Sequence, residues 1–217
     1  MDGATLQARI YNGYAKAATR LGFPCDVYRP LSASAPLANH IANIPVSLNA
    51  QDFTFQKPNL YGKAIWYALM DATVTKPGDY LVRGTDGNQF FIAGQQPHLP
   101  IIVVECNRLV WITRQVVNSA VGQLGYSGIT PSNAAAVLGT SSARWPASIL
   151  LGGRSQNAMN LPVSGKDVGW MVLLPPSATP EIMAGDLIND DLGRVYIVDG
   201  AEQTDLGWRI KTQELHT

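Results

Sequence analysis

The clearest pattern in the chain is a short hydrophobic hairpin that occurs twice, at residues 77–94 and 185–200. In each copy a Gly-Asp pair precedes an apolar run, a turn rich in Asp, Asn and Gly follows, and a second apolar run ends at a glycine. Turns of this composition join antiparallel strands. The repeat therefore predicts either two β-modules or two halves of one barrel.

The Gly-Asp pairs that open the two hairpins are candidate structural turns. The four residues are Gly78, Asp79, Gly185 and Asp186. A carboxylate directly after a glycine at the start of a strand can accept hydrogen bonds from backbone N–H groups. Because the pair occupies the same place in both copies, we expect Asp79 and Asp186 to fix turns rather than to act in catalysis.

Residues 2–21 predict one amphipathic helix. Its apolar side chains recur every three or four residues and form one stripe of Leu6, Ile10, Tyr14, Ala17 and Leu21. Asp2 is placed to cap this helix, and Gly22 is placed to end it. Gly13, in mid-helix, is either a tolerated flaw or a point of close backbone approach. The stripe packs either on the chain's own β-domain or on a neighbouring subunit, and the sequence leaves both open.

Hydrophobic periodicity is lost between residues 31 and 60. So long a stretch without periodicity is unusual inside a compact domain, and it predicts an extended arm laid over another surface. Two short alternating segments within it are suited to pair at the edge of a sheet. The apolar residues expected at subunit interfaces come from this arm and from the helix: Leu6, Ile10, Tyr14, Val46, Leu48, Phe53 and Phe55.

These patterns predict a mainly β protein, with an antiparallel barrel or sandwich built around the repeated hairpin, one N-terminal helix and a long extended arm. Its segments are the helix and first strand (1–30), the arm (31–60), a first β-module (61–117), an insertion rich in small residues (118–146) and a second β-module (147–217). The insertion has either a short helix or an exposed loop. The two modules are either separate or form one β domain over residues 61–217.

The composition narrows the classes of function. The chain has 217 residues, of which 46% are hydrophobic and 15% charged, and its formal net charge is zero. Soluble proteins usually carry about 25% charged residues, so much of this surface is either uncharged and polar or covered by partner subunits. The neutral balance argues against a broad nucleic-acid footprint. No apolar run approaches the roughly 20 residues of a membrane span, so no membrane partner is expected.

Motifs for catalysis, cofactors and metals are not found. The Gly-Lys pairs lack the other residues of a phosphate-binding loop, and the three histidines do not have metal-ligand spacing. We therefore expect a protein that is not an enzyme and has no cofactor. Cys25 and Cys106 are far apart in the sequence and predict two buried thiols, with a disulfide as the alternative.

The chain also resembles a family of virion proteins of tailed bacteriophages. The likeness begins in residues 11–30, continues through Trp66-Tyr67 and residues 96–108, and ends at Gly207-Trp208-Arg209. The Gly-Asp hairpin is similar to the hairpin of head-closure and head–tail joining proteins. The family has no catalytic residues to carry over to this chain.

What the resemblance implies is a structural protein of the neck, collar or head-closure type, present in the virion and assembled in the host bacterial cytoplasm. Such a protein forms a ring of about 6 or 12 copies that joins the portal or adaptor protein to tail proteins. Genomic DNA passes through the channel without sequence-specific contact. The alternatives are a capsid cement or decoration protein and, second, a virion-associated hydrolase or a carbohydrate-binding module.

Overall fold

One helix and thirteen strands make up the part of the chain that the structure describes. This computed structural model describes residues 2–49, 62–115, 134–152, 169–178 and 180–215. The elements are α1 (Gly3–Leu21), β1 (Phe23–Tyr28), β2 (His40–Asn49), β3 (Ile65–Leu69), β4 (Tyr80–Arg83), β5 (Gln89–Gly94), β6 (Ile101–Cys106), β7 (Arg108–Gln115), β8 (Ala134–Leu138), β9 (Trp145–Leu151), β10 (Gly169–Leu174), β11 (Leu187–Asn189), β12 (Val195–Thr204) and β13 (Gly207–Leu215).

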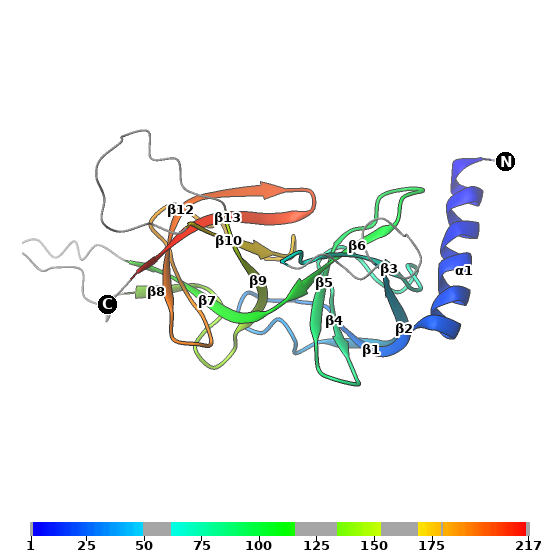
Figure 1. Ribbon diagram of the computed structural model, residues 1–217, viewed down its shortest axis with the longest axis horizontal. Helices are drawn as coiled ribbons and strands as arrows, with labels where there is room; N and C mark the ends of the chain where they lie inside the picture. The colour runs from blue at the N-terminus through cyan, green and yellow to red at the C-terminus, as the bar shows by residue number, and fades with distance from the viewer. Residues whose placement is uncertain (1, 50–61, 116–133, 153–168, 179, 216–217) are drawn as a thin grey trace, which may run out of the picture.

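Strands β1 to β6 form a closed antiparallel barrel in the order β1-β2-β3-β6-β5-β4, called the first barrel below (Figure 1). Side chains alternate between the two faces of a strand, so one residue in two faces the interior. In β5, Phe90 and Ile92 lie in the barrel core, whereas Phe91 between them packs in the cluster of the neighbouring unit. The predicted β architecture with one N-terminal helix is therefore confirmed.

Strand β2 corrects the prediction of an arm over residues 31–60. Residues 40–49 are a ten-residue strand that pairs with β1, from Phe23 opposite Val46 to Tyr28 opposite His40. Without β1 and β2 the other four strands cannot close a barrel, so this segment belongs to the fold of the subunit. The sequence shows alternation only around Val46 and Leu48, because small and polar residues and Pro45 occupy most of the other positions of β2. Residues 50–60 lie outside the described part of the chain.

Strands β7 to β13 form a seven-stranded sheet in the order β11-β12-β13-β10-β9-β7-β8. An additional pairing of β11 with β7 brings the sheet back on itself, so six strands complete a ring and β8 lies beside it. We call this unit the second barrel. The predicted insertion at 118–146 is wrong where it is described, because Ala134–Leu138 is a strand and Trp145, fully buried, begins another.

The two barrels repeat one topology. Strands β7, β9, β10, β11, β12 and β13 occupy the places of β1, β2, β3, β4, β5 and β6, in the same ring order. A bulge also falls at the same point of the fifth strand, between Ile92 and Gly94 in one barrel and between Val198 and Gly200 in the other. The sequence repeat of a hairpin is therefore part of a repeat of whole barrels, whose boundary falls at residue 107 and not at residue 117.

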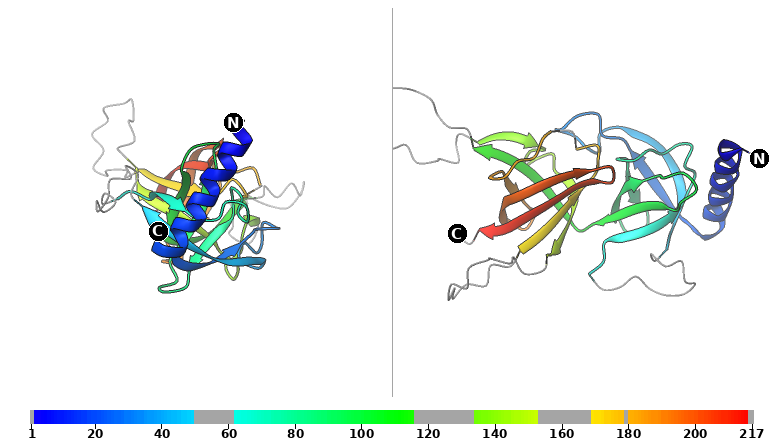
Figure 2. Two further views of the ribbon diagram at one scale, coloured as in Figure 1. Left: turned by 90° about the vertical axis from the view of Figure 1, so that its right-hand side faces the viewer. Right: turned by 90° about the horizontal axis from the view of Figure 1, so that it is seen from above.

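The helix and the two barrels lie in a row. Figures 1 and 2 show the barrels side by side along the long axis of the molecule, with α1 at the end next to the first barrel. Helix α1 contacts β2 and β3. Only Asn107 separates β6 from β7, so the chain passes directly from one barrel to the next.

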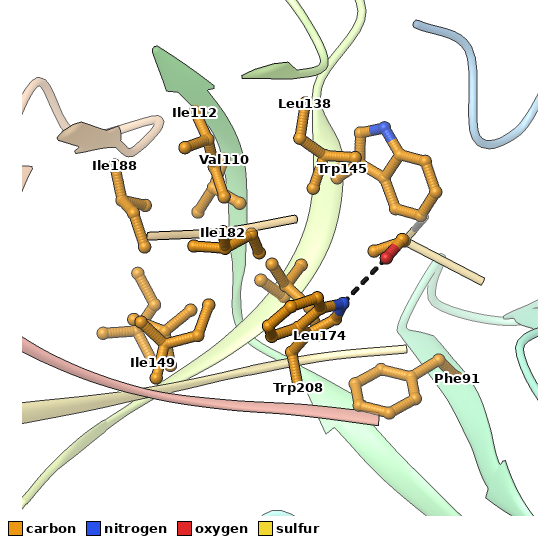
Figure 3. Packing of buried hydrophobic residues seen from close by; sticks show 14 of the residues in the cluster. Phe91, Val110, Ile112, Leu138, Trp145, Ile149, Leu174, Ile182, Ile188 and Trp208 are labelled. Carbon is orange, nitrogen blue, oxygen red and sulfur yellow. Dashed lines mark hydrogen bonds between the residues drawn. The ribbon is translucent and has the colours of Figure 1, made fainter. Parts of the chain in front are cut away.

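The largest hydrophobic cluster joins the second barrel to the first. Figure 3 shows Phe91 of the first barrel beside Trp208 of the second, whose indole N–H donates to the carbonyl of Ala178 over 2.7 Å. Tyr80, fully buried, donates its hydroxyl to the Pro146 carbonyl over 2.8 Å and packs edge to face against Trp145. The core of the second barrel therefore extends onto the outward face of the first barrel, whose interior holds a separate cluster.

Candidate assembly site

Asp79, one of the predicted turn residues, is 2% exposed and forms an ion pair with Arg29, which directly follows β1. Its two carboxylate oxygens accept hydrogen bonds from Arg29 Nε at 2.8 Å and Nη2 at 2.7 Å. Its Oδ2 also accepts from the Lys76 backbone N–H at 2.9 Å. The hydrogen bonds to Asp79 raise the pKa of the Arg29 guanidinium, so this cation stays charged. Asp79 thereby fixes the loop that leads into β4.

The second barrel repeats this arrangement. Asp186 accepts from Arg114 Nε at 2.7 Å and Nη2 at 2.8 Å, and from the Met183 backbone N–H at 2.8 Å. The two arginines also make equivalent hydrogen bonds to backbone carbonyls: Arg29 Nη2 donates to Val74 O, and Arg114 Nη2 donates to Glu181 O. Neither arginine was among the residues singled out from the sequence. The available signal was their position: Arg29 directly follows β1, and Arg114 lies one residue before the end of β7. Each of these two strands pairs with a strand that begins just after a Gly-Asp pair.

These clamps offer no chemistry beyond structure. Each carboxylate is filled by a bidentate arginine and a backbone donor, which leaves no free base beside a nucleophile. Across the described ranges, no three His, Cys, Asp or Glu side chains gather where a metal ion would bind. The same ranges contain no helix with the length and apolar character that a membrane crossing requires.

The two cysteines are free thiols, so the alternative of a disulfide is wrong. Cys25 lies in the core of the first barrel, and burial raises its pKa from 9.0 to about 11. Burial likewise raises the pKa of Cys106 well above its ordinary value. Both thiols therefore stay protonated near neutral pH, and neither is suited to act as a nucleophile.

The predicted apolar stripe of helix α1 only partly faces the first barrel. The side chains that pack against the barrel are Tyr11, Tyr14 and Ala18. At about 100° per residue, the centre of the stripe lies roughly 70° around the helix from this contact side. Leu6 is consequently 43% exposed and Leu21 66% exposed. One flank of the helix thus presents apolar side chains to solvent.

The outward side of α1 is basic. Arg9, Lys16 and Arg20 are exposed, and their positions on the helix lie opposite the barrel contact. The N-cap is Asp2, whose side chain accepts from the Thr5 backbone N–H at 2.7 Å, and the first turn has no other acidic residue. The helix therefore presents an apolar flank beside a positively charged face.

The predicted interface residues separate into three groups. Leu6, Ile10 and Tyr14 lie on α1, exposed in the case of Leu6 and half-buried in the other two. Val46 is 1% exposed inside the first barrel, and Leu48 packs against the same core. Their place in β2 removes these two from a contact surface, because they stabilise the subunit itself. Phe53 and Phe55 lie outside the described residues.

The chain matches no protein-family model, no curated protein and no solved structure. The chain's own residues and surfaces therefore have to indicate its function. Of these, the end formed by α1 is the candidate assembly site, since it combines apolar exposure with concentrated charge of one sign.

Proposed function

We propose that this protein is a structural subunit of the head-to-tail interface of a tailed bacteriophage, in a neck, collar or head-closure ring. In this role copies of the chain assemble with one another, with a portal or adaptor protein and with tail proteins around the DNA channel. The sequence resemblance to phage virion proteins supports the proposal. The fold adds support of a general kind, because the two buried aspartates of the repeated hairpins hold loops of the scaffold.

The observation that carries the proposal is the exposed apolar flank of α1 beside its basic face. A helix that hides only part of its stripe against its own barrel leaves surface that a partner can bury. The packed pair of barrels behind it provides a frame for such contacts, because one hydrophobic cluster joins the second barrel to the outward face of the first. A structural subunit needs these two properties and no active site.

Copy number and position in the virion test the proposal. Purified virions are examined by cryo-electron microscopy and by quantitative mass spectrometry, with the portal protein as the internal standard. About 6 or 12 copies at the base of the head support the neck role. Hundreds of copies on the shell would instead establish a decoration protein, and absence from the virion would overturn the proposal.

A further inference from the structure

Helix α1, the first barrel and the second barrel contact one another in a repeated arrangement. Helix α1 runs through Gly22 into β1, and β6 runs through Asn107 into β7. A Cβ at Gly22 would lie 2.7 Å from Val46 C in β2, and Asn107 donates its N–H to Ala147 O in β9 over 3.0 Å. Since β2 and β9 occupy the same place in their barrels, α1 covers the first barrel as the first barrel covers the second.

The first barrel uses a defined face for this contact. The Ser177 hydroxyl donates to Gly78 O over 2.8 Å, and a Cβ added at Gly78 would lie 2.7 Å from Ser177 Cβ. A Cβ at Gly94 would lie 2.7 Å from Leu206. The side chains of this face are fully or almost fully buried: Tyr80, Phe91 and Ala93.

The same face of the second barrel has no such partner among the described residues. Gly185 has φ of 90°, close to the 92° of Gly78, but no atom lies within 4 Å of an added Cβ there, nor at Gly200. In place of Tyr80, Phe91 and Ala93 this face carries Leu187 and Ile197, which are half-buried, and Asp199, which is exposed. We call Met183, Gly185, Leu187, Ile197, Asp199 and Gly200 the open face.

We propose that the open face binds the α1 end of a second copy of this chain, so that copies join head to tail. This inference rests on the proposed function in one respect, that copies of the chain assemble. The contact would continue the order already present within one subunit, in which each unit covers the next. A heterologous contact of this kind uses two different surfaces, and it builds rings when the rotation closes.

The charges and apolar groups of the two surfaces are complementary. Lys16 and Arg20 on α1 form no ion pair with a described residue, and neither do Glu181 and Asp199. The hydrogen bond from Gly185 N to Val198 O, 2.8 Å long, holds the loop after Glu181 beside Asp199. Opposite charges placed in this way orient partners and exclude the reverse pairing.

The apolar flank of α1 finds a matching strip on the open face. Met183 is 44% exposed, and Leu187 and Ile197 are half-buried around it. Beside them is a hollow of about 480 Å³, lined by Met171, Gly200, Ala201, Glu202, Arg209 and Lys211. Leu21, in the same last turns of α1 as Lys16 and Arg20, is the side chain that would be buried there.

A charge swap in the full-length protein tests the pairing. K16E/R20E and E181K/D199K are each expected to weaken self-association about tenfold or more, measured by sedimentation velocity across protein and salt concentrations. The variant carrying all four changes is expected to recover association. Lys211, also on the rim of the hollow, supplies a control of opposite sign, because K211E makes the face more acidic and should not weaken binding.

A matched control is K76E/D205K, which reverses two exposed charges away from both surfaces and should leave association unchanged. Circular dichroism shows whether each variant is folded. A chain that stays monomeric at all concentrations, or single reversals that leave association unchanged, would overturn the inference. These results would leave the neck role standing, because that role depends on location in the virion.

Cross-linking provides a second measurement that does not depend on charge. Protein carrying Ile10→Cys is mixed with protein carrying Ile197→Cys under mild oxidation, with the wild-type chain as the background for Cys25 and Cys106. Disulfide-linked dimers containing one copy of each variant are expected. Dimers within the Ile10→Cys preparation alone would show helix-to-helix contact and contradict the head-to-tail arrangement.

Discussion

At the scale of single residues, the Arg–Asp clamps stabilise the loops that lead into the two repeated hairpins. Asp79 and Asp186 are almost fully buried, and each receives three hydrogen bonds, two of them from a cation. Removing one partner of such a bond lowers the free energy of unfolding strongly, because the other charged group is left buried and unpaired. The clamps therefore contribute more than the exposed Arg83–Asp86 pair, which is 41% exposed at the carboxylate.

We predict that Asp79→Asn lowers the free energy of unfolding by about 2–3 kcal/mol, because an amide cannot accept all three hydrogen bonds. Asp86→Asn is the matched control and should cost less than about 1 kcal/mol, because its ion pair faces water. Urea denaturation measures both. Equal losses for the two variants would contradict a stabilising role for the buried clamp.

The buried thiol of Cys25 predicts a pH dependence of stability. Its folded pKa is about 11 and its ordinary value 9.0, so the unfolded chain releases this proton first as pH rises. The stability that the protonated thiol contributes is present in full below about pH 9 and is lost as the pH rises toward about 11. Cys106 and Tyr80, whose pKa values are also raised by burial, act in the same direction.

The Cys25 part is measured by comparing wild type with Cys25→Ala in urea at about pH 8, 9 and 10. We expect the stability difference between the two to shrink by up to about 1.4 kcal/mol per pH unit above pH 9. A difference that stays constant across this range would show that the thiol titrates alike in both states.

The clamp aspartates were recognisable from the sequence, whereas their arginine partners were not. Asp79 and Asp186 stood out because they recur beside a glycine at the start of equivalent apolar runs. Arg29 is 50 residues from Asp79, and Arg114 is 72 residues from Asp186. A pairing that the register of distant strands creates has no local signal, so only the barrel closure brings these residues together.

At the scale of elements, helix α1 was predictable and its orientation was not. Its bounds follow closely from the three- and four-residue spacing and from the caps Asp2 and Gly22. Helix caps depend on residues adjacent in sequence, so the sequence alone reveals them. Which side faces the barrel depends on how the helix enters β1, where Gly22 lies against the Ala18 carbonyl and Val46. Strand β2 was recognised only in part, as a short alternating segment suited to a sheet edge, because small and polar residues occupy most of its ten positions.

Two glycines of this helical segment should respond oppositely to alanine. No atom lies within 4 Å of a Cβ at Gly13, so Gly13→Ala should stabilise the protein by about 1 kcal/mol through helix propensity. At Gly22 the added Cβ would lie 2.6 Å from Ala18 O, so Gly22→Ala should destabilise it by about 1–3 kcal/mol. Thermal unfolding measures both, and a loss at Gly13 would indicate an unseen contact there.

At the scale of the whole molecule, the junction at Asn107 makes the barrels depend on each other. Its side-chain amide donates to Ile149 O and accepts from Ile149 N, each over 2.8 Å. The repeated hairpin allowed the two units to be anticipated from sequence. Their contact could not be, since it uses outward-facing residues such as Tyr80 and Phe91 whose burial only the docked arrangement reveals.

We predict that the native chain unfolds in one transition, with tryptophan fluorescence and far-ultraviolet circular dichroism changing together. Asn107→Ala leaves backbone groups of the nearly buried Ile149 unpaired, should cost about 2 kcal/mol, and should separate the two signals as the barrels uncouple. Asn88→Ala, in an exposed turn, is the control. Two separate transitions in the wild-type chain would contradict the coupling.

The direct passage from β6 through Asn107 to β7 also has a mechanical consequence. A load applied to one barrel reaches the other without a linker to extend, because one covalent backbone runs through both sheets. Along β6 and β7 that load acts parallel to the strands, so neighbouring hydrogen bonds resist it together in shear rather than opening one at a time. The two barrels therefore pass force directly from one to the other, with no slack segment between them.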